Sequence, residues 1–91
     1  MAGRRTKMDI INDMLSSIQD KGGKIKPTHL MYKANLSHKL LNGYLEELVN
    51  KEMIGKVEGK AGNQYIIIKD KGHEFLQHFR KMREFQDTFG L

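Results

Sequence analysis

The sequence contains no cysteine. A chain without thiols forms no disulfide, offers no thiolate nucleophile and builds no cysteine-ligated zinc finger. Long apolar runs are missing too: the longest, Tyr65–Ile68, is far short of the roughly 20 residues that a membrane helix needs. No apolar signal segment follows the first five residues, Met-Ala-Gly-Arg-Arg. We therefore expect a cytoplasmic protein with no membrane association.

The size and charge of the chain narrow the possibilities further. Its 91 residues suffice for one domain, and the 38% of hydrophobic and 30% of charged residues are typical of a folded globular domain. A domain this short has a small core, so we expect dimerisation to help stabilise it. The net charge of +5 favours a polyanionic partner, and nucleic acid is the first candidate.

The first part of the chain shows helical periodicity. Apolar residues recur at steps of three and four over residues 7–19, which predicts a helix capped by Thr6 and ended by Gly22-Gly23. Residues 24–26 are predicted to form a minimal edge strand. A basic arm, residues 1–6, precedes this region.

Two further helices are predicted close together. The second runs over Pro27–Lys33, because proline suits a first helical turn. The third runs from Ser37, a good N-cap, to about Lys51. About three residues, Ala34–Leu36, join the two helices, and this spacing is typical of a helix-turn-helix motif.

The remaining residues predict a hairpin and a last helix. Strand-like runs cover residues 53–58 and 63–69, and Gly59–Gly62 connects them. Asp70 is expected to cap the final helix, residues 70–91. The order of elements predicts an α+β fold: a winged helix-turn-helix domain over residues 7–69, with a three-helix core and a two-stranded wing, followed by a C-terminal dimerisation helix.

The third helix has the properties of a DNA recognition helix. Leu41, Leu45 and Leu48 form one apolar stripe, which anchors the helix to the core. Polar or small residues near the helix N-terminus fall mostly on the other side: Ser37, His38, Lys39, Asn42 and Gly43. In helix-turn-helix proteins this part of the helix meets base edges in the major groove.

The chemistry of each of these residues suits a contact with DNA. Asn42 can pair with adenine, and Lys39 can reach guanine or a phosphate. Ser37 and the free amides behind it can hold a phosphate. Gly43 allows close approach of the backbone. The alternative is an ordinary solvated helix face.

Candidate backbone contacts flank this helix. In the hairpin they are Lys56, Lys60, Asn63 and Gln64, since lysine and amide side chains suit contacts with a DNA backbone. Arg4 and Arg5 belong to the basic arm, and such arms often enter a minor groove. Lys33, at the end of the second helix, is a further candidate phosphate contact. The alternative is that these charges are only solvated.

The last helix carries more apolar residues than one small domain needs. Its first half is expected to pack on the core. The predicted dimer interface with a second copy consists of Phe79, Met82, Phe85 and Phe89. The alternative is that the tail folds back on its own domain or frays.

No catalytic or metal site is apparent. His73-Glu74 followed by His78 resembles a zinc-protease helix, but that motif needs histidines four residues apart, whereas these are five apart. The five-residue step turns them away from each other, so they cannot share one metal. We expect no enzyme activity, no cofactor, no metal and no small-molecule substrate.

Three stretches resemble a known family. They are Met31–Ser37 (MYKANLS), Gly43–Leu45 (GYL) and Lys69–Leu76 (KDKGHEFL), and they are similar to archaeal winged-helix proteins of the ten-kilodalton chromatin type. The resemblance covers about residues 4–85. It implies an archaeal DNA-binding protein that dimerises through an antiparallel coiled coil and acts in nucleoid organisation or transcription. By position, it implies that Ser37, His38, Lys39 and Asn42 face DNA and that residues 58–63 form the wing.

These observations predict a double-stranded DNA-binding protein, acting as a transcription regulator or a nucleoid-associated protein and forming a homodimer. The main alternative is a protein–protein interaction module, because winged helices also bind proteins through the third helix or the wing. Glu46 and Glu47 weaken the basic face of the third helix and keep that alternative open.

Overall fold

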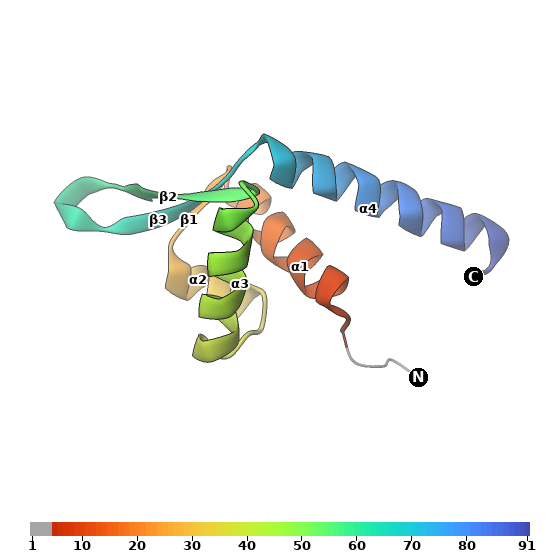
Figure 1. Ribbon diagram of the computed structural model, residues 1–91, viewed down its shortest axis with the longest axis horizontal. Helices are drawn as coiled ribbons and strands as arrows, with labels where there is room; N and C mark the ends of the chain where they lie inside the picture. Colours follow the sequence, from red (N-terminus) through yellow and green to blue (C-terminus); the bar gives the residue numbers. More distant parts are fainter. Residues whose placement is uncertain (1–4) are drawn as a thin grey trace.

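The computed structural model describes residues 5–91. Within them the elements follow in this order: α1 (Lys7–Asp20), β1 (Lys24–Ile25), α2 (Pro27–Lys33), α3 (His38–Asn50), β2 (Ile54–Glu58), the 3-10 turn η1 (Lys60–Gly62), β3 (Gln64–Ile68) and α4 (Asp70–Phe89). Figure 1 shows that the β2–β3 hairpin and the free end of α4 project from opposite sides of the body that α1, α2 and α3 form. The predicted α+β winged-helix order is confirmed.

Both ends of α1 are set by local sequence. The Asp9 backbone N–H donates to the Thr6 hydroxyl at 3.1 Å, and the Thr6 N–H donates to the Asp9 carboxylate at 3.0 Å, forming a capping box. At the other end, Gly22 and Gly23 adopt positive φ angles of 79° and 93°. The Gly23 N–H donates to the Ile18 carbonyl at 2.9 Å, which satisfies an acceptor that the helix leaves free.

The turn between α2 and α3 is equally local in origin. Asn35 adopts a left-handed conformation (φ 55°), which asparagine tolerates better than most residues. The Leu36 N–H then donates to the Met31 carbonyl at 3.0 Å. Ser37 caps α3, because its hydroxyl accepts from the Leu40 N–H at 3.2 Å. The chain therefore reverses within three residues, as predicted.

Three strands form an antiparallel sheet in the order β1-β3-β2. Ile54 faces Ile68, and Ile25 faces Ile66. The strands are slightly shorter than predicted. Met53 lies outside β2 because its N–H bonds to the Leu48 carbonyl at the end of α3.

The core lies between the helices and one face of the sheet. Each of α1, α2, α3, β2 and β3 contributes at least one side chain that is almost completely buried. These are Met14, Leu15, Ile18, Leu30, Leu48, Ile54 and Ile66. Since α3 joins this core through Leu41, Leu45 and Leu48, its opposite face is free.

The start of α4 differs from the prediction. Lys69, not Asp70, is the N-cap, and Asp70 is the first helical residue with no side-chain cap bond. The reason is tertiary: the Lys69 N–H donates to the Met53 carbonyl at 3.0 Å, which fixes the chain one residue earlier. Gly72 is buried, and its backbone lies so close to Met53 that a Cβ on residue 72 would be 2.5 Å from the Met53 carbonyl oxygen. The first half of α4 then packs against α1.

Candidate nucleic-acid interface

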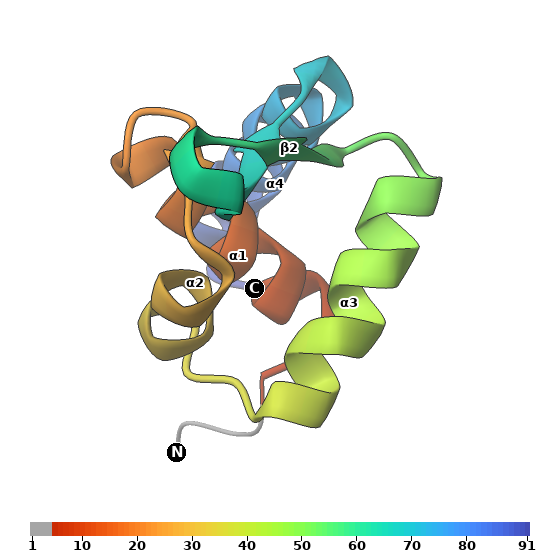
Figure 2. The same cartoon turned by 90° about the vertical axis from the view of Figure 1, so that its left-hand side faces the viewer.

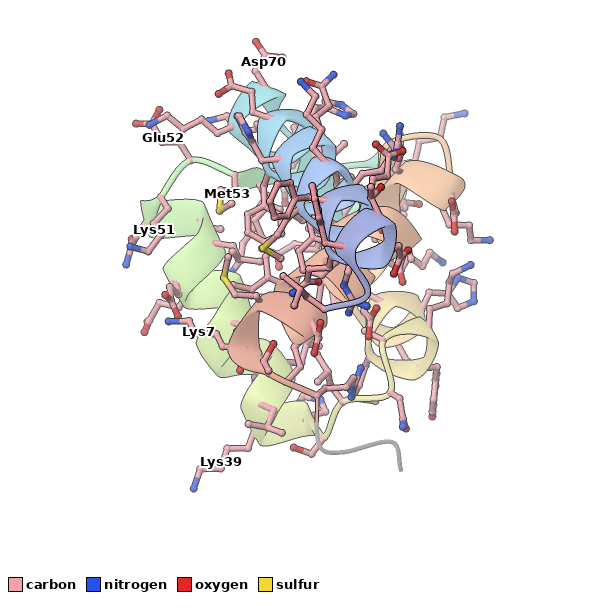
Figure 3. All side chains as sticks on the ribbon, turned by 90° about the vertical axis from the view of Figure 1, so that its right-hand side faces the viewer. Lys7, Lys39, Lys51, Glu52, Met53 and Asp70 are labelled. Carbon is pink, nitrogen blue, oxygen red and sulfur yellow. The ribbon has the colours of Figure 1, made fainter. Side chains whose placement is uncertain are left out.

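The outer face of α3 collects the predicted recognition residues. These residues are all exposed, whereas the leucine stripe on the opposite face of α3 is buried. The exposed set is Ser37, His38, Lys39, Asn42 and Gly43. Figure 3 shows Lys39 at the N-terminal end of α3, pointing away from the body. The prediction that α3 is amphipathic is confirmed. The fold of α3 brings these five residues together on one accessible surface.

Few of these side chains are occupied by contacts within the protein. Asn42 Nδ2 lies 3.4 Å from His38 Nδ1, one helical turn away, and both groups face solvent. Ser37 accepts one cap bond and keeps its own hydroxyl proton for another acceptor. Lys39 forms no ion pair within residues 5–91. An amide, a hydroxyl and an ammonium therefore face solvent together.

Gly43 leaves a gap in this face. A Cβ built there meets nothing within 4 Å. Beside it, α3 and the start of α1 border a shallow groove of about 400 Å³ lined by Lys7, Lys39, Leu40, Gly43, Tyr44 and Glu47. Leu40 is 50% exposed, an apolar feature that the sequence pattern did not predict.

An ion pair closes the inner side of this groove. Lys7 Nζ lies 2.7 Å from Glu47 Oε2, and this hydrogen bond raises the pKa of Lys7 and lowers the pKa of Glu47. Both groups are accessible to water, so the pair contributes little to stability. The pair has a larger effect on the charge of the surface, because Lys7 neutralises Glu47. Glu46 remains exposed on the outer face of α3.

The β2–β3 hairpin projects beyond the helices. Its tip is built by Ala61 (φ 60°) and Gly62 (φ 73°), and the Gly59 N–H donates to the Asn63 carbonyl at 2.6 Å. The predicted contacts of the hairpin all have exposed side chains: Lys56, Lys60, Asn63 and Gln64. Figure 2 looks onto this side, with the hairpin above α2 and with α3 to the right.

A comparison with family models decides which family has this arrangement. A family described as "Winged helix-turn-helix" matches residues 4–87. The chain belongs to the winged helix-turn-helix family. In this arrangement α2 and α3 form the helix-turn-helix, and the β2–β3 hairpin is the wing. A comparison with curated protein sequences finds no match.

Solved structures share the fold. Sso10a-2, a DNA-binding protein from Sulfolobus solfataricus, superposes with a TM-score of 0.79 at 20% identity, over 93% of this chain and 85% of that one. The winged-helix DNA-binding protein F93 from STIV has a TM-score of 0.72 at 12% identity, over 91% and 92%. MepR, a transcription regulator from Staphylococcus aureus, has 0.75 at 13% identity, over 89% of this chain but 62% of its own. The archaeal resemblance seen in the sequence is supported by the first of these.

Of the two arginines in the basic arm, only Arg5 belongs to the described residues. Arg4 lies outside the described residues. Arg5, predicted as a DNA contact, is instead bound to its own domain: its guanidinium donates to the Ala34 carbonyl at 2.7 Å, the Asn35 carbonyl at 2.8 Å and the Asp13 carboxylate at 3.0 Å. Its guanidinium bonds to carbonyl oxygens in the turn between α2 and α3, so Arg5 is held by its own domain and is not part of a free arm.

Lys33 lies where the sequence placed it, exposed at the end of α2. Its neighbour Tyr32 is 72% exposed and was not predicted as a surface feature. The exposure of Tyr32 follows from its position in the helix, because α2 has only seven residues and only Leu30 among them is buried. An aromatic ring two residues beyond Leu30 therefore falls on the solvent side.

The apolar residues of α4 divide into two groups. Phe79, predicted as part of a dimer interface, is only 8% exposed; it stacks on Phe75, with ring centroids 5.9 Å apart, and lies under Arg83. It belongs to the fold of its own chain, because α1 reaches far enough to cover it. The exposed group begins one turn later: Met82 (44%), Phe85 (59%), Phe89 (64%) and Leu91 (81%).

No helix within residues 5–91 is long and apolar enough to cross a membrane. Over the same span, no three His, Asp or Glu side chains come together in a way that would hold a metal ion. His73 contacts Gln19, at 3.2 Å between Nδ1 and Nε2, rather than an acidic partner.

Proposed function

We propose that this protein binds double-stranded DNA as a cytoplasmic transcription regulator or nucleoid-associated protein, and that it has no enzyme activity. One observation carries the proposal: the exposed face of α3 presents His38, Lys39 and Asn42 side by side, opposite a buried leucine stripe. A helix with this division fits a major groove, which admits one α-helix and displays donors and acceptors for amide and ammonium groups.

The wing supports the same orientation. Lys56 and Lys60 on the hairpin would lie against the sugar–phosphate backbone when α3 is in the groove, and Asn63 and Gln64 offer neutral donors. The net charge of +5 attracts the duplex before these contacts form. The structures similar in fold include proteins described as DNA-binding and as transcription regulators, which favours this use of the fold.

We also propose that the protein forms a homodimer through the free half of α4. Met82, Phe85 and Phe89 are exposed on a segment that extends past the domain body (Figure 1). Phe85 and Phe89 already pack on each other, with ring centroids 4.8 Å apart, and form an apolar pair that water solvates poorly. Burying it against a second copy gives the dimer two recognition helices.

The DNA proposal is tested by fluorescence anisotropy of a labelled duplex at several salt concentrations. The wild-type protein should bind with a log–log salt slope of several units, since each neutralised phosphate contributes roughly 0.9. Lys39→Ala with Asn42→Ala should weaken binding severalfold. The matched control is Lys71→Ala with Gln77→Ala, which removes the same side-chain types from exposed positions on α4. An absence of binding at low salt would reject DNA binding and direct attention to a protein partner.

A further inference from the structure

A second basic surface lies on the other side of the wing from α3. A hollow of about 290 Å³ is lined by Lys21, Lys24, Ile25, Lys26, His29 and Tyr65. Three of these residues are lysines, one is a histidine, and none of the lining residues is acidic. Like charges held together repel one another, so a small domain gains no stability from this arrangement.

The backbone under this hollow is firmly positioned. Ile25 is 2% exposed and pairs with Ile66 of β3, so it anchors the strand while Lys24 and Lys26, on either side, are both exposed. The Ile68 N–H donates to the Gly23 carbonyl at 3.1 Å and ties the preceding turn to the sheet. The backbone that carries Lys24 and Lys26 is therefore fixed at the edge of the sheet.

Tyr65 orients one of the ammonium groups. Lys24 Nζ lies 4.8 Å from the centre of the Tyr65 ring, a geometry in which the ring attracts the cation without neutralising it. The ring is itself held, because it lies against Gly59, where a Cβ would approach Tyr65 Cε2 to 2.3 Å. The Tyr65 ring therefore contacts both Lys24 of β1 and Gly59 of the hairpin. The charge of Lys24 remains available to an anion.

The sheet order locates this hollow relative to α3. The strands run β1-β3-β2, and β2 is the strand that directly follows α3. The β1 edge is consequently the edge of the sheet away from β2, next to the start of α2, and Figure 2 shows the hairpin above α2 with α3 to the right. A duplex held by α3 and the wing continues past the wing toward this edge.

We propose that Lys21, Lys24 and Lys26 bind the phosphate backbone of the same duplex beyond the wing, so that two surfaces hold the DNA on either side of the hairpin. This inference rests on the proposed DNA binding. Phosphates are the expected ligand because the lysines converge on a shallow, open hollow without the donor and acceptor pattern that would read bases. The contact therefore adds affinity without sequence preference.

The test compares two variants with the same change of charge. Lys24→Gln with Lys26→Gln should lower the salt slope of duplex binding by roughly 2, since each lost phosphate contact removes about one unit. The loss should be equal on duplexes of different sequence. The matched control, Lys71→Gln with Lys81→Gln, changes two exposed lysines of α4 and should leave the slope close to that of the wild-type protein. Lys24→Arg with Lys26→Arg should retain the wild-type slope.

The outcomes separate this inference from the function on which it rests. If the wild-type protein does not bind duplex DNA, the proposed function and this inference both fail. If it binds, and the two glutamine variants have the same slope, then only net charge matters and the hollow is not a contact. The test can be repeated on duplexes shortened one base pair at a time. Once the DNA no longer passes the wing, wild type and Lys24→Gln/Lys26→Gln should have the same salt slope. A difference independent of length would overturn the placement on the same duplex.

Discussion

Arg5 Nη1 lies 2.7 Å from the carbonyl oxygen of Ala34, which joins the start of the chain to the turn before the recognition helix. The same guanidinium bonds to Asn35 and Asp13, so one side chain connects α1 with the turn that sets the direction of α3. Arg5 therefore acts on the recognition surface through the fold, by holding the carbonyls of a left-handed turn that would otherwise depend on water.

Arg5→Ala should lower the free energy of unfolding by about 1 kcal/mol, the usual net contribution of a hydrogen bond, because the partly exposed guanidinium exchanges its bonds with water. Arg5→Lys should recover only part of it, because an ammonium lacks the fork that reaches two carbonyls. Urea titration measures both, with Arg80→Ala on α4 as an exposed control. The salt slope for DNA should stay unchanged in Arg5→Ala. A drop of about one unit would instead make Arg5 a phosphate contact.

Gly72 and Gly43 should respond in opposite directions to the same substitution. Gly72→Ala forces a Cβ against the Met53 carbonyl and Ile68, so it should destabilise the protein by about 1 to 3 kcal/mol. Gly43→Ala meets open space within α3 and should stabilise it by roughly 0.5 to 1 kcal/mol, since alanine is the better helix former. Thermal unfolding of both variants checks the pair. Equal stability of Gly72→Ala and wild type would mean that α4 moves off the sheet without cost.

Local patterns predicted most of the fold. Ser37 caps α3 and Thr6 caps α1 because a hydroxyl beside a helix start has an amide within reach, whatever the rest of the chain does. The leucine stripe of α3 and the glycine-bearing turn of the wing are local in the same sense. These features predicted correctly which face of α3 is buried and which is exposed.

The errors came from contacts between distant parts of the chain. Arg5 was predicted to belong to an arm that contacts DNA, whereas two of its three partners are carbonyl groups 29 and 30 residues away. Phe79 was assigned to a dimer interface, because periodicity shows which face of α4 is apolar but not where α1 stops covering it. The basic hollow was missed for a related reason: Lys24 and Tyr65 meet only when β1 pairs with β3.

Asp9 should make stability depend on pH at the acidic end. The Thr6 backbone N–H, then the Thr6 hydroxyl and the Arg83 guanidinium, hold the pKa of the Asp9 carboxyl below its ordinary value of 3.8. Because the folded-state pKa is the lower one, this stabilisation is present above pH 3.8 and is lost as the pH falls through the folded-state pKa.

Asp9→Asn removes the charge with little change in shape. The variant should be less stable than wild type at neutral pH, and the difference should shrink as the pH falls below the ordinary carboxyl value. Urea midpoints of both proteins across this range provide the measurement. Asp20→Asn, at the exposed end of α1, removes the same charge elsewhere on the helix and serves as the control. A constant difference between Asp9→Asn and wild type at all pH values would contradict the assignment to the carboxylate charge.

The exposed half of α4 should control the oligomeric state. Phe85→Glu with Phe89→Glu places two charges in the apolar pair, and a dimer built on it should dissociate, because charges buried without partners cost several kcal/mol. Gln77→Glu with Thr88→Glu adds the same charge at exposed polar positions of α4 and tests whether charge alone separates the subunits. Sedimentation equilibrium at micromolar protein should show a dimer for wild type and a monomer for the phenylalanine variant.

Because the fold of residues 5–79 does not use these two rings, the monomer should keep its helical circular dichroism and bind DNA more weakly through one recognition helix instead of two. A wild-type protein that sediments as a monomer while bound to DNA would reject the dimer and leave Phe85 and Phe89 as a surface for a different partner.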